Sequence, residues 1–282
     1  MNTWTTLVEA EALAAGLDSD DLVVVDCRFS LAAPEAGEAA YRVSHIPGAR
    51  YAHLDRDLSD HRKRGEGRHP WPDAEDFTAR LGGWGISAAH QVVAYDDGDG
   101  AHAARLWFLL RALGHERVAV LDGGWARWTA LGLPTQTGVR DVMRVARDGR
   151  FDDSRLLDAP EVQAHLERGG MLVDARARGR FLGEAEPIDR LAGHVPGAIN
   201  RPYADNLVEG RFKPRDRLAL EFGELLGRHD AADVVAMCGS GVTACHHLLA
   251  MEHAGLPGAK LFTGSWSGWI EDPARPVATG ES

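Results

Sequence analysis

One cysteine of this chain stands where the surrounding sequence favours a reactive thiol. Cys238 ends an apolar run and is followed by Gly239, Ser240 and Gly241, after which a segment with helical periodicity begins. Glycines permit backbone angles that other residues avoid, and they remove side chains from beside the sulfur. Amides at a helix N-terminus favour an anion and lower the pKa of a nearby thiol, so the pattern predicts a nucleophile. The alternative is a small buried residue at a strand end, which is common for a free cysteine.

The residues that follow the cysteine argue against one class of enzyme. Cysteine phosphatases place an arginine six positions after the nucleophile, where this chain has Ala244. No Arg or Lys lies between Cys238 and His253. A phosphate ester would therefore lack its main charge partner, and phosphatase activity is not expected.

The bulk composition narrows the class of protein. A length of 282 residues predicts two domains of ordinary size. The net charge of −11 argues against non-specific binding of nucleic acid or of an anionic membrane. No apolar run approaches the length of a membrane span, and the N-terminal stretch has no signal-peptide pattern. Three cysteines do not make a disulfide framework, so a cytoplasmic setting is expected.

The chain contains an internal repeat. Four motifs recur in the same order at an offset of about 140–150 residues. The pairs are "LVVVDCR" with "MLVDARAR", "SHIPGARY" with "GHVPGAIN", "VVAYDDG" with "VVAMCGS", and "LDGGWARW" with "FTGSWSGW". Four pairs in register indicate a tandem duplication.

Each copy alternates short apolar runs with amphipathic segments. The predicted strands are 22–26, 91–95 and 117–121 in the first copy, and 171–174, 233–237 and 259–262 in the second. The predicted helices are 73–84, 101–113, 217–226 and 242–253. This alternation predicts an α/β fold, with a parallel sheet covered by helices on both faces in each copy. The irregular stretch between the copies places the domains at 1–134 and 154–282, with a linker at 135–153.

Several motifs together resemble a known family, the tandem-domain rhodanese-like sulfurtransferases, and the resemblance covers nearly the whole chain. The motifs are "SHIPGA", "GHVPGA", "LDGGWARW", "GRFLGEAEPID", "CGSGVTA" and "GSWSGWIEDPARPVATG". The resemblance implies two rhodanese-like domains, each a central parallel sheet flanked by helices, of which only the second is catalytic. The first copy agrees, because the counterpart of Cys238 is Asp96, which cannot carry a sulfane sulfur.

The resemblance implies covalent transfer of sulfur. The Cys238 thiolate attacks the sulfur of a small-molecule donor and becomes a persulfide. A thiol acceptor, either a small thiol or a thioredoxin-like protein, or cyanide in an assay, then removes the outer sulfur. Backbone amides of the loop are expected to stabilise the negative sulfur. They belong to the stretch from Gly239 through Gly241 and Val242 to Thr243.

The donor is expected to be 3-mercaptopyruvate. Gly239 and Ser240 are neutral, whereas relatives that use thiosulfate carry cations at these positions. Three acidic residues of the "GRFLGEAEPID" motif add repulsion to a dianion if they face the site, namely Glu184, Glu186 and Asp189. The resemblance implies that Arg180 grips the substrate carboxylate or carbonyl, a task that suits a planar guanidinium. Thiosulfate stays open as the alternative donor, and a persulfide carrier or regulatory module as an alternative function.

The same subgroup implies a proton-handling group that resembles the triad of serine proteases. Ser240 of the loop is expected to join His69 and Asp57, both from the first domain. The aspartate match requires a gap, so Asp55 or Asp60 are alternatives. Two further features of the resemblance have no assigned role: Arg190 follows the "GRF" motif, and Gly268 replaces an acidic residue between two tryptophans.

No cofactor and no metal are expected. His246, His247 and His253 share a predicted helix but do not form a zinc-protease motif. The stretch "DDGDG" at 96–100 lacks the glutamate of a calcium loop and corresponds to the cysteine loop of the second copy. Cys27 and Cys245 are expected to be packed residues, and the basic run 61–69 a solvated loop.

Overall fold

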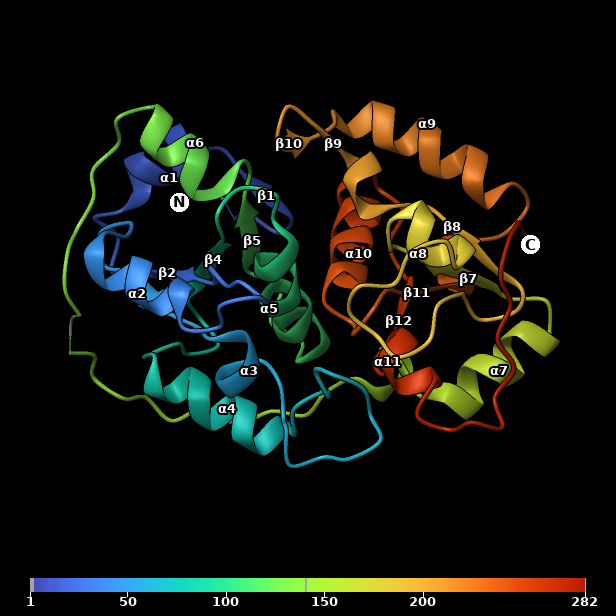
Figure 1. Ribbon diagram of the computed structural model, residues 1–282. Helices are drawn as coiled ribbons and strands as arrows, with labels where there is room; N and C mark the ends of the chain where they lie inside the picture. Colours follow the sequence, from blue (N-terminus) through green and yellow to red (C-terminus); the bar gives the residue numbers. More distant parts are fainter. Residues whose placement is uncertain (1–2, 140, 282) are drawn as a thin grey trace. The chain divides into compact units, whose positions relative to one another are not determined.

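The computed structural model describes residues 3–139 and 141–281, and the chain divides into two compact units (Figure 1). The first unit consists of Met1–Asp60, Pro72–Asp152 and Glu209–Arg211, and the second of His61–Trp71, Asp153–Val208 and Phe212–Ser282. Residues 61–71 thus belong to the second unit, although they lie within the sequence of the first repeat. The continuous domain limits expected from the sequence, 1–134 and 154–282, stay a prediction.

The first unit is built on a parallel sheet of five strands in the order β1-β5-β4-β2-β3. The strands are β1 (Leu7–Val8), β2 (Leu22–Asp26), β3 (Arg50–Tyr51), β4 (Gln91–Tyr95) and β5 (Val118–Leu121). The helices are α1 (Ala10–Gly16), α2 (Ala36–Val43), α3 (Leu54–Asp57), α4 (Ala74–Gly83), α5 (Ala101–Ala112) and α6 (Gly124–Ala130). The central strands are almost wholly apolar, because a parallel sheet buries both of its faces.

Alternation along the strands assigns helices to the two faces of this sheet. Val24, Val93 and Ala119 form one cluster with Leu13 of α1 and Trp128 of α6. The strand residues between them are also buried and face the other way. The other face is covered by α5, which packs on β4 and β5.

The second unit repeats this architecture, with a parallel sheet in the order β6-β12-β11-β7-β8. Its strands are β6 (Leu156–Leu157), β7 (Met171–Asp174), β8 (Ala198–Asn200), β11 (Val234–Met237) and β12 (Lys260–Phe262). The helices are α7 (Ala159–Glu167), α8 (Arg178–Leu182), α9 (Arg215–Leu226), α10 (Thr243–His253) and α11 (Ser265–Trp269). Short 3-10 turns cover Asp153–Arg155, Tyr203–Asn206 and Ala231–Asp233, and a hairpin joins β9 (Leu207–Val208) to β10 (Arg211–Phe212).

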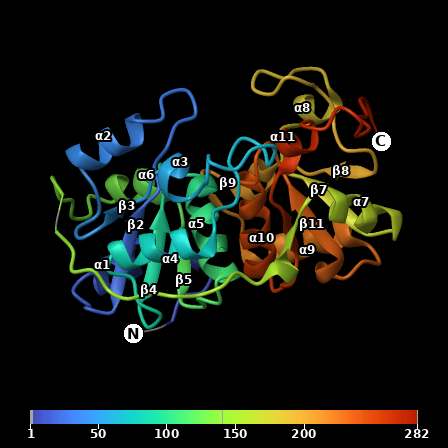
Figure 2. The same ribbon diagram turned by 90° about the horizontal axis from the view of Figure 1, so that it is seen from below.

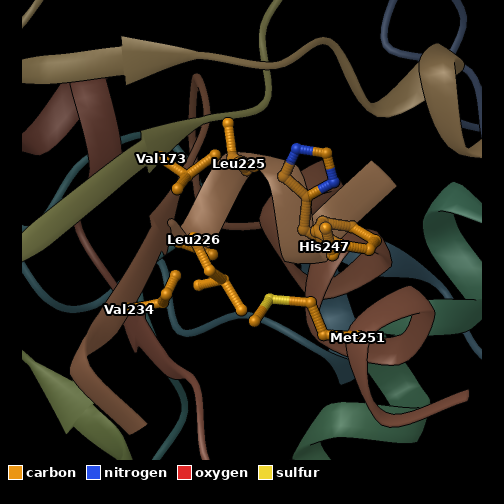
Figure 3. A pocket seen from close by; sticks show the side chains of 8 residues that line it. Val173, Leu225, Leu226, Val234, His247 and Met251 are labelled. Atoms are coloured by element: carbon orange, nitrogen blue, oxygen red, sulfur yellow. The ribbon is translucent and has the colours of Figure 1, made fainter. Parts of the chain in front are cut away.

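The second sheet is also covered on both faces. One face packs against α7, α8 and α11 through a cluster that includes Val162, Phe181 and Trp266. On the other face α10 lies beside β11 in both ribbon views (Figure 2). Between this face and helices α9 and α10 is a small apolar pocket, where Leu226 and Met251 point toward each other beneath the ring of His247 (Figure 3).

The duplication extends to individual side-chain contacts. Each copy buries an aspartate–arginine pair whose guanidinium stacks on a tryptophan: Asp26, Arg28 and Trp125 in the first, and Asp174, Arg176 and Trp266 in the second. The guanidinium carbon lies 4.7 Å from the ring centroid in both copies. Both tryptophans therefore complete a packed structural group.

All six strands predicted from the sequence are confirmed to within one residue at each end, and so are the four helices apart from an earlier start of α9. The short edge strands β1, β3, β6 and β8 were not predicted. Each has only two or three residues, too few to show a hydrophobic period. None of the helices in the described residues has the length and apolar character needed to cross a membrane.

Candidate active site

Cys238 lies at the carboxyl end of β11, in the short loop that leads into α10. Its side chain is buried, with 2% of the residue exposed. Gly241 has φ of +75°, a left-handed conformation that favours glycine. Gly239 does not have a left-handed backbone, and it fits the other expected role of a glycine here, which is to leave out a side chain. A Cβ there would lie 3.1 Å from Nη2 of Arg68 and 3.4 Å from Nη1 of Arg180, so the position is limited by space.

The start of α11 fixes the orientation of the cysteine loop. The amide of Trp266 donates to the carbonyl of Cys238 at 2.9 Å, and the amide of Ser267 donates to the carbonyl of Gly239 at 2.9 Å. In a planar trans peptide the N–H points opposite to the preceding C=O. The amides of Gly239 and Ser240 therefore point away from α11. Two of the backbone amides that were expected to stabilise the sulfur therefore point in the same direction.

The helix start adds further donors. Val242 is the residue before α10 and is buried, and Thr243 is the first residue of the helix. The first amides of an α-helix have no partner within the helix, and they carry the positive end of its dipole. The assignment of these amides to the reacting sulfur stays a prediction.

His69 and Ser240 are brought together as predicted. Nδ1 of His69 lies 2.8 Å from Oγ of Ser240, and both residues are buried. One expectation needs revision, because His69 belongs with residues 61–71 to the second compact unit, not to the first. The pair is therefore formed within one unit, from segments 171 positions apart in the sequence.

Glycines allow the segment 61–71 to lie close to the start of α11. Gly67 has φ of +90°, and a Cβ there would lie 2.6 Å from the carbonyl oxygen of Gly264. A Cβ on Gly268 would lie 3.4 Å from the amide nitrogen of Gly67. The amide of Arg68 donates to Oγ of Ser267 at 2.9 Å. Gly268, which had no role from the sequence, thus leaves room for the segment that carries Arg68 and His69.

Asp57 has its described partners inside the first unit. It ends α3, where its carboxylate accepts from the amide of His53 at 2.7 Å and pairs with Nε of Arg80 at 2.9 Å. Burial raises the pKa of Asp57, although these two groups and Arg56 oppose the rise. Asp60, an alternative to Asp57, is also buried. Participation of either aspartate with His69 stays a prediction.

Arg180 lies on α8 and is held by two carboxylates. Its Nε donates to both oxygens of Glu186 at 3.0 and 3.1 Å, and its Nη2 donates to Asp189 at 2.9 Å. Burial acts to raise the pKa of Glu186, but the amides of Asp189 and Ile188 and the Arg180 guanidinium lower it overall. Both acidic residues therefore neutralise part of the charge of Arg180. The sequence had left open whether they face the site. The third, Glu184, is exposed, and so is Arg190.

Arg68 is a neighbour of the cysteine loop that the sequence interpretation missed. Its side chain pairs with Asp189, the same carboxylate that binds Arg180, and its Nη2 faces Gly239. The run 61–69 had been interpreted as a solvated loop with His69 at its end, which is wrong for Arg68, because its side chain is only 23% exposed and pairs with Asp189. The available signal was its position next to His69, a residue already assigned to the site.

The other cysteines are packed residues. Cys245 donates its thiol proton to the carbonyl of Gly241 at 3.3 Å, from the first turns of α10. Burial, with Asp26 adding to it, raises the pKa of Cys27 well above its usual range. Neither environment favours a thiolate.

Potential metal ligands gather at one place in the described residues. Asp60, Asp73 and Asp76 have carboxylate oxygens within 4.8 Å of one another, and two of the three are exposed. All three belong to the first unit. Within the described residues, no such group forms around Cys238.

Comparisons with known proteins identify the family of the chain. The model of the rhodanese-like domain matches residues 9–131 and 158–272. A Pseudomonas aeruginosa protein named "Probable 3-mercaptopyruvate sulfurtransferase" is 49% identical over 98% of both chains. A Mycobacterium tuberculosis relative that bears the name of a thiosulfate sulfurtransferase is 39% identical over 97% of both. The crystal structure of SseA from Escherichia coli, described as a 3-mercaptopyruvate sulfotransferase, matches with a TM-score of 0.81 and 32% identity, covering 94% of this chain and all of that one.

Proposed function

The chain belongs to the rhodanese-like domain family, and from that premise we propose that it is a 3-mercaptopyruvate sulfurtransferase whose sulfur is carried on Cys238. The single observation that supports this most is the loop itself. A buried thiol ends a parallel strand, a left-handed glycine turns the chain, and a helix start follows. A relative that is 49% identical over 98% of both chains is named "Probable 3-mercaptopyruvate sulfurtransferase".

The first half-reaction transfers a neutral sulfur atom to the enzyme. The Cys238 thiolate attacks the thiol sulfur of 3-mercaptopyruvate and forms the S–S bond of a persulfide. The C–S bond breaks, its electron pair stays on the carbon, and pyruvate leaves as its enolate. One proton then converts this enolate to pyruvate. In the second half-reaction an acceptor thiolate attacks the outer sulfur and releases the Cys238 thiolate.

The loop amides stabilise the anion in both half-reactions. Amides of Gly239 and Ser240 point away from α11, and those at the start of α10 carry the helix dipole. Fixed donors of this kind favour a thiolate before attack and the terminal persulfide sulfur after it.

The pair formed by His69 and Ser240 supplies the proton. The leaving enolate is a strong base, and the Ser240 hydroxyl lies two residues from the reacting sulfur with His69 at 2.8 Å behind it. Donation from Ser240 with replacement from His69 gives general acid catalysis. An aspartate that orients the imidazole, Asp57 or Asp60, completes this group in the proposal.

The charge around the loop suits a monoanionic donor. Gly239 and Ser240 add no charge. The Arg180 guanidinium pairs with Glu186 and Asp189, and that of Arg68 pairs with Asp189. Two cations balanced by two anions attract a single carboxylate through direct hydrogen bonds, and they offer little long-range attraction to a dianion. Thiosulfate is the second candidate donor, because the Mycobacterium tuberculosis relative bears that name.

The acceptor in the proposal is a thiol. Because Cys238 is 2% exposed, the outer sulfur is reached most readily by a small thiol or by a cysteine that projects from a partner such as a thioredoxin-like protein. The three cysteines are free, which suits the reducing cytoplasm. A carrier or regulatory module would need the thiol but not the His69–Ser240 pair.

Turnover with the two donors, measured side by side on the full chain, tests the proposal. The expected kcat/KM is higher with 3-mercaptopyruvate than with thiosulfate. A preference for thiosulfate would replace the proposed donor. Formation of a persulfide without turnover of either donor, in the presence of a small thiol, would indicate a carrier.

A further inference from the structure

Two guanidiniums, from distant parts of the sequence, face the loop that carries Cys238. If a side chain began at Gly239, its Cβ would lie 3.1 Å from Nη2 of Arg68, 3.4 Å from Nη1 of Arg180 and 3.5 Å from Nη2 of Arg180. All of these residues belong to the second unit. The space beside Gly239, directly after the reacting cysteine, is thus bounded by arginine nitrogens.

Asp189 holds the two arginines together. One of its oxygens binds Nη1 of Arg68, and the other binds Nη2 of Arg180. A carboxylate that bridges two guanidiniums shows that their spacing fits a carboxylate. Because the Asp189 side chain is only 5% exposed and binds both guanidiniums, the pair is held in place before any substrate arrives.

Within the described residues, Arg68 has donors that no acceptor satisfies. In the described residues its side chain hydrogen-bonds only to Asp189, through Nη1. Its Nε is buried without a partner, and its Nη2 is the arginine nitrogen nearest to Gly239. A buried N–H without an acceptor costs about 1–3 kcal/mol, so an incoming acceptor is favoured there.

The backbone delivers Arg68 to this position independently of its side chain. The contact of Gly67 with Gly264 and the hydrogen bond from the Arg68 amide to Ser267 anchor the segment. Removal of the Arg68 side chain therefore leaves both anchors and the neighbouring His69 in place.

We propose that Arg68 is a substrate-binding residue, which acts with Arg180 to grip the carboxylate of the 2-oxo acid donor beside Gly239. The inference rests on the proposed function and adds a specificity determinant from a segment outside the cysteine loop and the "GRF" motif. With the carboxylate held by Arg68 and Arg180, the thiol end of the donor is directed toward Cys238.

Steady-state kinetics with a pair of donors tests Arg68. Arg68→Ala is expected to raise the KM for 3-mercaptopyruvate by about 10- to 100-fold, the loss of one charged hydrogen bond, with a smaller change in kcat. Arg68→Lys, which keeps the charge but not the planar fork, is expected to give an intermediate KM. Arg64→Ala removes the same charge from an exposed position of the same segment and is the matched control, with KM within about twofold of wild type.

Mercaptoacetone is the second donor, because it keeps the ketone and thiol but has a methyl group instead of the carboxylate. Its KM is expected to be the same in Arg68→Ala and wild type. An equal rise in KM for both donors would overturn the proposal and make Arg68 a residue that only positions the loop. A KM for 3-mercaptopyruvate like that of Arg64→Ala would also overturn it. Failure of the wild type to use 3-mercaptopyruvate would instead contradict the proposed function.

Discussion

The loop after β4 in the first unit and the loop after β11 in the second unit share one frame and differ at their first residue. In both loops the carbonyl of that first residue accepts from the amide of a tryptophan farther along the chain. Trp125 of α6 donates to Asp96 at 2.8 Å, and Trp266 of α11 donates to Cys238 at 2.9 Å. Five positions then separate this residue from the first residue of the following helix, α5 or α10. The duplication has therefore kept the length of this loop and its contact with a tryptophan, although the left-handed residue is Gly100, four positions after Asp96, in the first copy and Gly241, three positions after Cys238, in the second.

The first copy fills its loop with a carboxylate of its own. Asp96 accepts four backbone hydrogen bonds between 2.9 and 3.1 Å, from the amides of Gly98, Gly100, His102 and Ala103. In the described residues the Sγ of Cys238 has no such bond. We infer that both loops are anion-binding sites, one filled by the Asp96 carboxylate and the other left for the sulfur of the reaction.

The largest expected effect comes from the residue that differs. Cys238→Ser should lower turnover by at least about 10³-fold, because the hydroxyl is a weak nucleophile and cannot carry a sulfane sulfur. Sulfur transfer to cyanide measures this directly. Cys245→Ser and Cys27→Ser are the controls and should keep most of the activity. Substantial turnover by Cys238→Ser would move the chemistry away from this loop.

The second effect concerns the proton supply, which only the second copy has. His69→Ala should lower kcat with 3-mercaptopyruvate by about 10²–10⁴-fold, the usual contribution of general acid–base help. Ser240→Ala should act in the same direction. Thiosulfate is the internal control, because sulfite leaves without needing comparable proton delivery. Equal and small effects on both donors would remove His69 from the chemistry.

The third effect is on stability and should occur only in the first copy. Asp96→Ala leaves four loop amides without their acceptor, and we expect the free energy of unfolding to fall by at least about 1.5–3 kcal/mol. Denaturant unfolding at neutral pH measures the change, with Cys238→Ala as the matched variant. We expect Cys238→Ala to change stability by about 1 kcal/mol or less, since no described hydrogen bond is lost. Similar losses of unfolding free energy in both variants would contradict the proposed difference between the two loops.

The smallest effect is a pH dependence of the unfolding free energy, to which one buried histidine in each unit contributes. Burial, with a nearby arginine, lowers the pKa of His115 in the first unit to about 4 and that of His247 in the second to about 3. The unfolded chain binds these protons below about pH 6.5, whereas the folded chain does not. Stability is therefore present above pH 6.5 and lost as the pH falls, by about 1–2 kcal/mol per histidine at pH 5.

Single substitutions separate the two histidines. His115→Gln and His247→Gln should each flatten the decline in unfolding free energy between pH 7 and pH 5, measured by denaturant unfolding at a series of pH values. A decline as steep as that of wild type in either variant would show that the histidine is already protonated or exposed.

Much of this architecture is visible in the sequence because the buried strands are long enough to show a pattern. The runs 22–26 and 91–95 have their predicted bounds, and the order of motifs revealed the duplication. The short edge strands have no period and were missed. The cause is physical, since such strands are defined by the neighbour they pair with and not by their own residues.

The candidate site was predictable where a residue type carries the chemistry, and less so where position does. Cys238, Ser240 and His69 followed from the motifs and the resemblance. Arg68 did not, because its approach to the loop depends on a close contact between Gly67 and Gly264 that are 197 positions apart. The groups that crowd Gly239 were also hidden, since they are two guanidiniums from other segments.

The central claim is that the second loop accepts sulfur from 3-mercaptopyruvate and the first does not. Mass spectrometry of the full chain, after exposure to 3-mercaptopyruvate without an acceptor and again after cyanide, tests it most directly. The account predicts a gain of one sulfur atom, located by peptide mapping on Cys238 and lost on addition of cyanide. An unchanged mass, or a sulfur mapped to Cys27 or Cys245, would contradict it.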